Sequence, residues 1–249
     1  MFKLNSSLVI GKVISTLKYL DHKLFLSMNK DFGAQVKRSH QYYYEQLIYV
    51  KVEDIKWGTN NPAKFAKDMR EDVLFVKSGN WDTYYKTPIL EYTKQHRSCR
   101  TTWEIFVEQI HYKDSSQYRS MINKVKSGMP VKGCYSEEDV KMYFDDLLTI
   151  YQNIKTYGYK TQDALDGSKK NEIRVYIDRH GEFMLGSEGN HRYMIAKILN
   201  LNKIPVIVKG IHYLWAKKCY DYYNNRNLLK SIQEGLRNMD RSSQEDFIQ

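Results

Sequence analysis

Apolar and polar residues alternate in the second half of the chain in a pattern that predicts a β-hairpin. Ile173–Ile177 alternates as a strand, and Phe183–Leu185 is suited to a strand that returns beside it. Residues 178–181, with the sequence DRHG, have the composition of a turn, because aspartate and glycine tolerate the backbone angles that a turn requires. We therefore predict two short antiparallel strands joined by a tight turn.

A helix and a further strand are predicted after the hairpin. Residues 204–208 form a short apolar run that is suited to a buried strand. Before this run, apolar residues recur at the spacing of one helix face. These residues are Tyr193, Ile195, Ile198, Leu199 and Leu201. The predicted helix begins at or near Asn190, directly after the polar residues 187–189.

The middle of the chain, from Ile89 to Tyr159, is predicted to be helical. Its clearest helix starts at residues 136–139, whose sequence SEED is a capping-box pattern, and ends near Gly158. One face of this helix is apolar and is typical of a helix packed into a core. That face carries Val140, Tyr143, Phe144, Leu147, Tyr151 and Ile154.

Strands are also predicted on the N-terminal side of these helices. Residues 40–56 form a β-prone run that ends in a turn-like segment at 57–62, and residues 73–76 form a second strand before a turn at 77–80. Trp81 and Asp82 follow this turn. Trp81 suits a core anchor or a platform for a base or sugar, while Asp82 suits a helix cap, a metal ligand or a proton acceptor for a hydroxyl.

The length of 249 residues, with 42% hydrophobic and 14% aromatic residues, favours one elaborated domain. We divide the chain into a basic amphipathic helical arm at 1–36, a main domain at 37–215 with a helical insertion at about 89–165, and a tail at 216–249. The arm lacks a dense cationic face, which favours packing on the main domain over a membrane surface. The basic, tyrosine-rich helical tail is typical both of single-strand binders and of a surface helix.

The formal net charge of +10 favours polyanions, nucleotides or acidic membrane surfaces as partners without choosing among them. No apolar stretch is long enough to span a bilayer, and Leu8 to Leu20 lacks a cleavage site, so we expect no transmembrane segment and a cytoplasmic location. Cys99, Cys134 and Cys219 are odd in number and widely spaced. They suggest neither a disulfide framework nor a zinc site.

The most informative stretch is residues 188–192, with the sequence EGNHR, where a strand is predicted to turn into a helix. A helix N-terminus leaves backbone N–H groups unpaired and carries partial positive charge. Gly189 would let a phosphate approach the backbone, and Arg192 could bind its oxygens. Spacing alone is equally consistent with a simpler interpretation, in which Asn190 caps the helix and His191 and Arg192 are solvated first-turn residues.

These residues resemble the phosphate-binding box of the ParB/sulfiredoxin-like superfamily. The resemblance lies in residues 189–192 followed by Ala196, Leu199 and the strand at 204–206. Residues 48–55 resemble the entry strand of the superfamily, whose valine, x, aspartate, isoleucine segment matches residues 52–55, with Asn61-Pro62 nearby. Further matches to an uncharacterised ParB-like group with a helical insertion are residues 79–82, 103–104 and 154–159.

The resemblance implies an α/β (α+β) fold, with a small mixed ParB/sulfiredoxin-like sheet, a helical insertion and helical extensions at both termini. Sulfiredoxin chemistry needs a cysteine where this chain has Asn190, so peroxiredoxin repair is not implied. The Gly-Glu-Arg-Arg box and helix-turn-helix of CTP-binding partition proteins are also absent. The pattern of acid, glycine, x, histidine and arginine is closer to the free serine kinases of this superfamily.

The resemblance therefore implies a nucleotide- and phosphate-binding protein and, by analogy, a phosphotransferase acting on a small hydroxylated substrate. Gly189, Asn190, His191 and Arg192 are the predicted binding residues for ATP or another nucleotide with Mg²⁺, without a resident metal site. Phosphoryl transfer depends mainly on positioning and charge neutralisation. Glu188 and His191 are the predicted catalytic residues of the box, together with Asp82.

A second hypothesis is a ParB-like nucleic-acid-binding protein or nuclease without kinase activity, in which positive charge binds phosphate backbones. This hypothesis requires the basic residues to cluster on one face. The sequence spreads its lysines almost evenly, which counts modestly against it. The nucleotide, the acceptor substrate and the oligomeric state are not determined by the sequence.

Overall fold

The computed structural model describes most of the chain. The described residues are 34–36, 46–59, 64–65, 75–167, 171–223 and 227–242. The predicted amphipathic arm therefore lies outside the described residues, apart from 34–36, and so does the Asn61-Pro62 segment.

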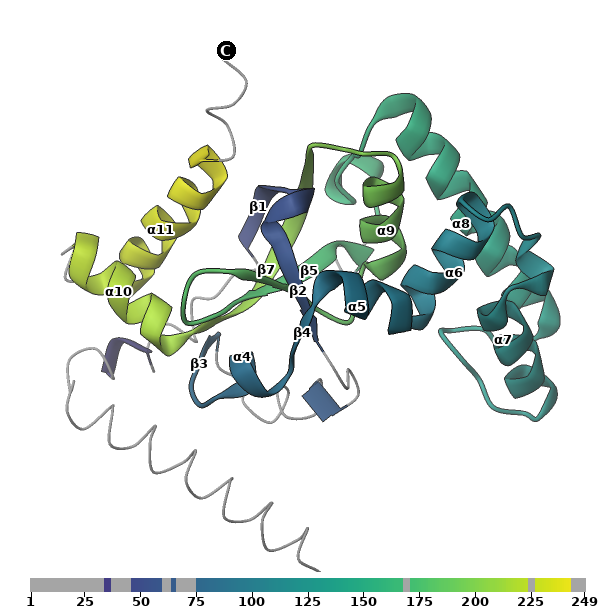
Figure 1. Ribbon diagram of the computed structural model, residues 1–249, viewed down its shortest axis with the longest axis horizontal. Coiled ribbons are helices and arrows are strands. Elements are labelled where there is room, and N and C mark those ends of the chain that lie inside the picture. The colour runs from purple at the N-terminus through teal and green to yellow at the C-terminus, as the bar shows by residue number, and fades with distance from the viewer. Residues whose placement is uncertain are drawn as a thin grey trace, which may run out of the picture.

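A mixed open sheet lies at the centre of the molecule (Figure 1). In the described part of the chain its strands follow the order β1-β7-β5-β6-β2-β4, with β3 beside β7. The pairs β5–β7, β2–β6 and β3–β7 are parallel, and the other pairs are antiparallel. The strands are β1 Gln46–Lys51, β2 Ile55–Thr59, β3 Val76–Lys77, β4 Lys86–Pro88, β5 Ile173–Ile177, β6 Phe183–Leu185 and β7 Lys203–His212. The predicted α/β fold class is confirmed.

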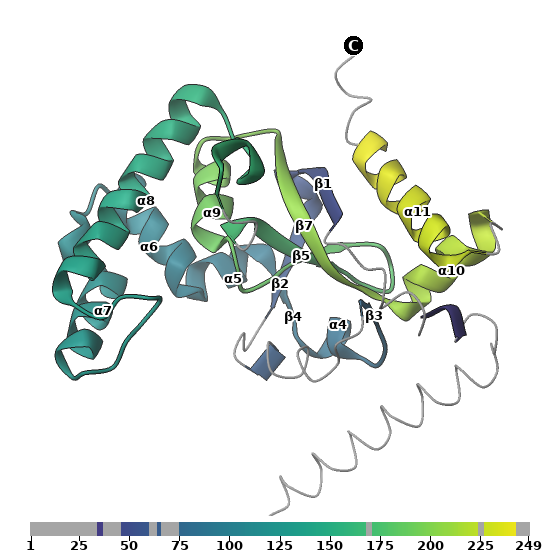
Figure 2. The same cartoon turned by 180° about the vertical axis from the view of Figure 1, so that it is seen from behind.

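Helices flank the sheet on two sides, as the two opposite views show (Figures 1 and 2). Helices α10 and α11 pack against each other at one side, α5 to α8 form a helical lobe at the other, and α9 lies between the sheet and α8. The helices are α4 Trp81–Tyr84, α5 Ile89–Gln95, α6 Arg97–Phe106, α7 Ser116–Lys126, α8 Glu137–Tyr157, α9 Asn190–Ile198, α10 Tyr213–Tyr223 and α11 Leu228–Ser242. None of the described helices has the length and apolar character needed to cross a membrane.

The predicted hairpin, helix and strand are confirmed. Strands β5 and β6 pair antiparallel through Ile177 and Phe183, and α9 begins at Asn190. Strand β7 is longer than the predicted apolar run and ends at His212. Its last residues, Ile211 and His212, pair with β3. The chain thus passes from β6 through residues 186–189 directly into α9.

The capping box at the start of α8 is also confirmed. The Ser136 hydroxyl accepts a hydrogen bond from the Asp139 N–H, and the Asp139 carboxylate accepts one from the Ser136 N–H. Gly158 ends the helix at a φ of 73°. Both ends of this long helix are therefore specified by local sequence.

Two of the predicted boundaries are wrong. Trp57, Gly58 and Thr59 were expected in a turn, but they lie in strand β2, because this segment pairs with both β4 and β6 and is covered by Tyr92. Residues 73 and 74 of the second predicted strand lie outside the described residues, and β3 extends one residue into the predicted turn at 77–80, because Lys77 pairs with the end of β7. In both cases pairing with a distant strand decided the outcome, and the local propensity did not.

Helix α9 belongs to two hydrophobic cores at once. Tyr193, Met194 and Ala196 face the core of the sheet, while Ile195 packs into the core of the helical lobe. All of these side chains are at most 4% exposed. The position of α9 is therefore fixed from both sides.

The entry into α9 depends on a close contact between two backbones. Gly189 is the N-cap and has a φ of 75°, in the left-handed region that favours glycine. A Cβ atom at this position would lie 2.4 Å from the Cα of Ile173 in β5. Gly189 is therefore required by packing against the strand, whether or not a ligand also approaches it.

We predict that Gly189→Ala lowers the free energy of unfolding by roughly 2–5 kcal/mol, since it adds a steric clash to the cost of a left-handed alanine. Gly128 is a matched control, because its φ is 73° and a Cβ there would meet nothing within 4 Å. Gly128→Ala should cost only roughly 1–2 kcal/mol. Chemical denaturation of both variants measures the difference, and equal losses would contradict a role for the contact with β5.

Candidate functional site

The start of α9 opens onto a cavity of about 490 Å³ between the helical lobe and the sheet. Its size falls in the range that accommodates small ligands. Its wall contains two cations, Lys132 and Arg192, and two carboxylates, Asp146 and Glu188. The lining residues are Ser98, Lys132, Tyr143, Asp146, Leu147, Ile150, Asn171 and residues 187–192. The structure thus brings the whole predicted box to one cavity.

The backbone at the start of α9 offers free donors to this cavity. Gly189 has no side chain to cap the helix, and the structure, over the residues that it describes, assigns no hydrogen bond to the N–H groups of Asn190, His191 and Arg192. These N–H groups carry the positive end of the helix dipole. An anion in the cavity would satisfy them.

The side chain of Asn190 points into the core. It is 4% exposed, its Oδ1 accepts a hydrogen bond of 2.9 Å from the Tyr92 hydroxyl, and its Nδ2 donates one of 3.1 Å to the Gly186 carbonyl. Burial raises the pKa of the Tyr92 hydroxyl well above its ordinary value, so the tyrosine stays neutral and can donate. Asn190 therefore fixes the loop and can offer a ligand only its backbone N–H.

His191 is the central member of a polar chain that joins three helices and a loop. Its Nδ1 lies 2.8 Å from the Thr102 hydroxyl on α6, and its Nε2 lies 2.8 Å from the Tyr143 hydroxyl on α8. Thr102 donates its own proton to the Ser98 carbonyl at 2.8 Å, so it must accept from a protonated Nδ1. Nε2 then accepts the proton of Tyr143.

This series of hydrogen bonds ends at the ammonium group of Lys132. Its Nζ donates to the Tyr143 hydroxyl at 3.3 Å and to the Ser98 hydroxyl at 3.3 Å. Burial, followed by the charge of nearby Arg97, lowers the pKa of Lys132. His191 therefore helps to hold a cation at the cavity, and both of its ring nitrogens are already engaged.

The environment of His191 favours the neutral ring. Burial, followed by the charge of Lys132, lowers its pKa from the ordinary value of 6.5 to about 3. A neutral ring is what the polar chain requires, because Nε2 must accept a proton from Tyr143. His191 consequently contributes no positive charge to the cavity near neutral pH.

Arg192 and Glu188 stand on either side of the helix start. The Arg192 guanidinium donates to the Asn171 carbonyl and, at 2.9 Å, to the Gln162 side chain, so part of its hydrogen-bonding capacity holds the loop that precedes β5. Glu188 is 46% exposed and lies 3.5 Å from Arg174. Glu188 is thus the predicted acid that remains accessible from the cavity.

Asp82 lies away from the other predicted catalytic residues. It forms a bidentate ion pair with Arg179, with distances of 2.6 Å and 2.7 Å. Arg179 follows the C-terminal end of β5, whereas Gly189 lies against the N-terminal end of this strand. The length of β5 alone separates the two places by about 16 Å. Burial would raise the pKa of Asp82, but Arg179 and His212 outweigh this and lower it. The arrangement gives Asp82 a structural partner and no access to the cavity.

Lys132, Ser98 and Tyr143 were missed by the sequence analysis. Lys132 lies in the loop between α7 and α8, at a φ of 53°, and no motif surrounds it. Tyr143 was assigned to the apolar face of α8, which is correct for its ring but gives no hint of its hydroxyl. Only the packing of α6 and α8 around α9 brings these groups together.

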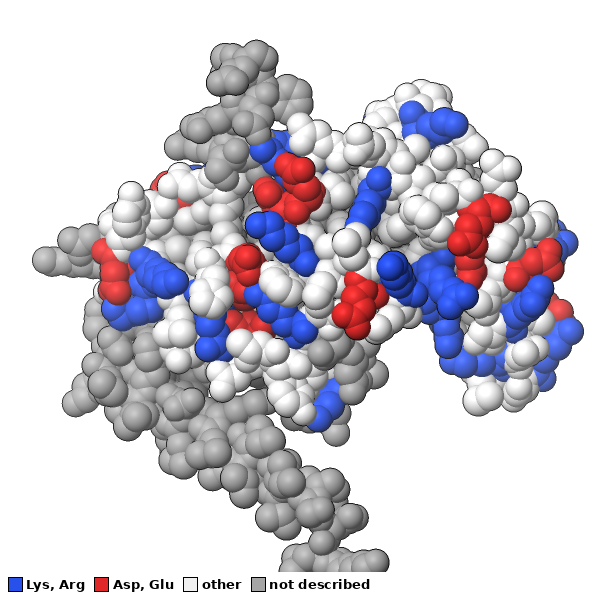
Figure 3. Space-filling model, viewed as in Figure 1, with Lys and Arg blue, Asp and Glu red and all other residues white. Residues whose placement is uncertain are grey.

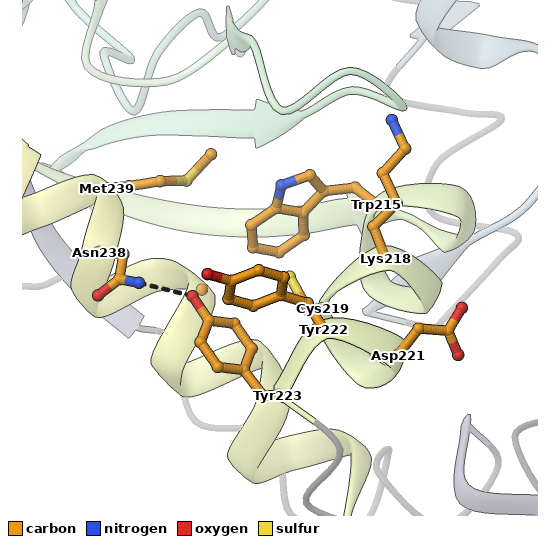
Figure 4. A pocket seen from close by; sticks show the side chains of 9 residues that line it. Trp215, Lys218, Cys219, Asp221, Tyr222, Tyr223, Asn238 and Met239 are labelled. Carbon is orange, nitrogen blue, oxygen red and sulfur yellow. Dashed lines mark hydrogen bonds between the residues drawn. The ribbon is translucent and has the colours of Figure 1, made fainter.

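A larger hollow of about 730 Å³ lies between α10 and α11, where Trp215, Tyr222 and Tyr223 gather (Figure 4). Its wall is mainly aromatic and apolar. The ammonium of Lys218 donates to the Arg179 carbonyl at 3.3 Å. Despite its size, this hollow has no set of donors comparable with that at the start of α9.

Comparisons with known proteins add no identification. No protein-family model matches the chain, and neither a curated protein nor a solved structure matches it.

A pH-dependent contribution to stability follows from the low pKa of His191. Below about pH 6.5 the unfolded chain gains a proton at this residue, while the folded protein does not until the pH nears about 3. His191→Gln removes this proton uptake. The stability advantage of the wild type over the variant should therefore shrink as the pH falls from 6 to 4, by up to about 1.4 kcal/mol per pH unit.

Chemical denaturation at several pH values measures this difference. The control is Gln152→Ala, an exposed change on α8 that removes no titratable group and should differ from the wild type by an almost constant amount. A constant difference for His191→Gln would show instead that the ring is not held neutral in the folded protein.

Proposed function

We propose that this chain is a cytoplasmic protein that binds a nucleotide, with the phosphates at the start of α9. The observation that carries the proposal is that unpaired N–H groups of residues 190–192 and the ammonium of Lys132 converge on one cavity. A helix N-terminus and a fixed cation are the two features with which proteins most often hold phosphate. The cavity volume of about 490 Å³ is sufficient for a nucleoside phosphate.

The order of elements supports an assignment to the ParB/sulfiredoxin-like superfamily. The resemblance implies a phosphate box that is followed by a helix and then a strand, and residues 189–192 are followed by α9 and β7. Fold membership alone would not establish activity. The argument for a phosphate ligand therefore rests on the groups that face the cavity.

Transfer of the terminal phosphoryl group to a small hydroxylated substrate is the reaction that we assign to this site. Glu188 and Asp146 are carboxylates on the cavity wall, and either is placed to accept the proton of a hydroxyl or to bind a magnesium ion brought by the nucleotide. No group of three or more metal-binding side chains occurs in the described residues. Asp82 is too distant to take part.

Two single substitutions test the site while leaving Gly189 and His191 in place. Lys132→Gln removes the cation and should weaken the binding of ATP, ADP or CTP with magnesium by roughly 10- to 100-fold, the usual effect of losing one charged hydrogen bond. Ser187→Asp places a carboxylate on the cavity wall and should abolish binding. The added charge lies near a helix N-terminus, which stabilises it, but it replaces the hydrogen bond from Ser187 to Glu188, so the folding of this variant is checked by circular dichroism.

Lys230→Gln, an exposed change on α11, serves as the control and should leave binding unchanged. Isothermal titration calorimetry measures the affinities, and a screen of hydroxyl compounds for phosphorylation follows for the nucleotide that binds. If the folded wild type binds none of the three nucleotides, the proposal is wrong. Equal binding by Ser187→Asp would place the nucleotide elsewhere.

A further inference from the structure

Positive charge is concentrated on one part of the helical lobe. Residues 89–133, which include α5 to α7, contain eight Lys and Arg against four Asp and Glu, whereas residues 134–165 contain three against six. The space-filling view shows lysine and arginine side chains gathered over α6 and α7 (Figure 3). The even spread of lysines along the sequence therefore does not persist in the fold.

Several of these cations have no carboxylate to neutralise them. Over the ranges that the structure describes, Arg100, Arg119 and Lys126 form ion pairs on this lobe. Lys94 and Lys124 are exposed and form none. They join a further set of cations on the lobe that likewise have no ion pair among the described residues, namely Arg97, Lys113 and Lys132.

The unpaired cations come from three helices that pack one after another, α5, α6 and α7. Arg97 at the start of α6 donates to the Ser120 hydroxyl of α7 at 3.2 Å, and Lys124 lies one helical turn beyond Ser120 on the same side of α7. Lys94 lies at the end of α5, just before Arg97. The charges thus lie on neighbouring helices of the lobe.

An exposed tryptophan completes this surface. Trp103 is 42% exposed, while the other three tryptophans of the chain, all in the described residues, are buried or half-buried. Arg97, Arg100 and Trp103 follow at three-residue intervals along one face of α6. A flat apolar ring left in solvent among cations is suited to stacking on a base.

We propose that this cationic face, defined by Lys94, Arg97, Lys124 and Trp103, binds single-stranded nucleic acid. The cations would contact successive phosphates, and Trp103 would stack on an unpaired base. None of these four residues lines the nucleotide cavity, although Arg97 lies near Lys132, so the inference does not require the cavity to be occupied. A duplex would offer the same phosphates but no accessible base for the ring.

The charge component is tested by the salt dependence of binding to a labelled 20-nucleotide single strand, followed by fluorescence anisotropy. The triple variant Lys94→Gln, Arg97→Gln and Lys124→Gln should reduce the slope of log affinity against log salt by about 2, since each lost phosphate contact contributes about 0.7.

The matched control is a second triple variant that changes Lys56, Lys155 and Lys230 to glutamine and removes the same charge from exposed positions elsewhere. Its slope and affinity should stay close to those of the wild type. Equal losses in the two triple variants would show a diffuse charge effect and overturn the proposal.

The stacking component is tested by Trp103→Ala and Trp103→Phe. The alanine variant should bind the single strand about 10-fold more weakly, and phenylalanine should restore most of the loss, while binding of the matching duplex should change little. Equal losses on single strand and duplex would overturn the role of the ring.

Two further measurements separate the inference from its alternatives. Vesicles containing anionic lipid should not displace the labelled strand from the protein. Displacement that depends on the same residues would identify a membrane-binding face instead. A double variant, Lys94→Gln and Lys124→Gln, which leaves Arg97 beside Lys132 in place, should keep the nucleotide affinity of the wild type. Loss of nucleic-acid binding with intact nucleotide binding would support a separate binding face. Loss of nucleotide binding with intact nucleic-acid binding in Ser187→Asp would support a separate cavity.

Discussion

The arrangement of this protein depends on how the first turn of α9 is held. On one side the backbone of Gly189 lies against β5, where a Cβ atom would be 2.4 Å from Ile173. On the other side the ring of His191 bridges Thr102 and Tyr143 and so links α9 to α6 and α8. Because both contacts act within one turn, the helix start is fixed relative to the sheet and to the helical lobe. Both the cavity and the placement of Lys132 follow from this.

The elements that the sequence predicts well are those whose signals are local. The capping box at Ser136 and the strand at β5 need no information from distant residues, and both are confirmed, although all five residues of β5 are buried. The turn expected at Trp57 is wrong because the segment gains strand partners that lie far away in the sequence. A glycine such as Gly58 is consistent either with a turn or with a side chain that packs closely against the backbone. In the fold, the ring of Tyr92 packs against Gly58, so the second interpretation holds.

The candidate site shows the same division. The box at residues 188–192 could be located from sequence, because a glycine before a helix with polar first-turn residues is a local pattern. The roles of its side chains could not, since they depend on neighbours from other elements. The pattern predicts His191 as a ligand-binding residue, yet its two ring nitrogens form hydrogen bonds with hydroxyl groups of the lobe. Lys132 had no motif, and its loop brings it to the cavity only after α7 and α8 have packed.

The structural roles of these side chains limit which groups can contact a ligand at the site. Asn190, His191 and Arg192 each use their side chains to hold surrounding structure, so the donors that remain to the cavity from this turn are mainly backbone N–H groups. Backbone donors fixed on two sides need little reorganisation when an anion arrives, which is the condition for strong electrostatic stabilisation. Specificity for the rest of the ligand must then come from the lobe side of the cavity, where Tyr143 and Asp146 lie. Under the proposed function, the first turn of α9 and Lys132 would hold the phosphate, while other residues of the helical lobe would determine which phosphorylated molecule is bound.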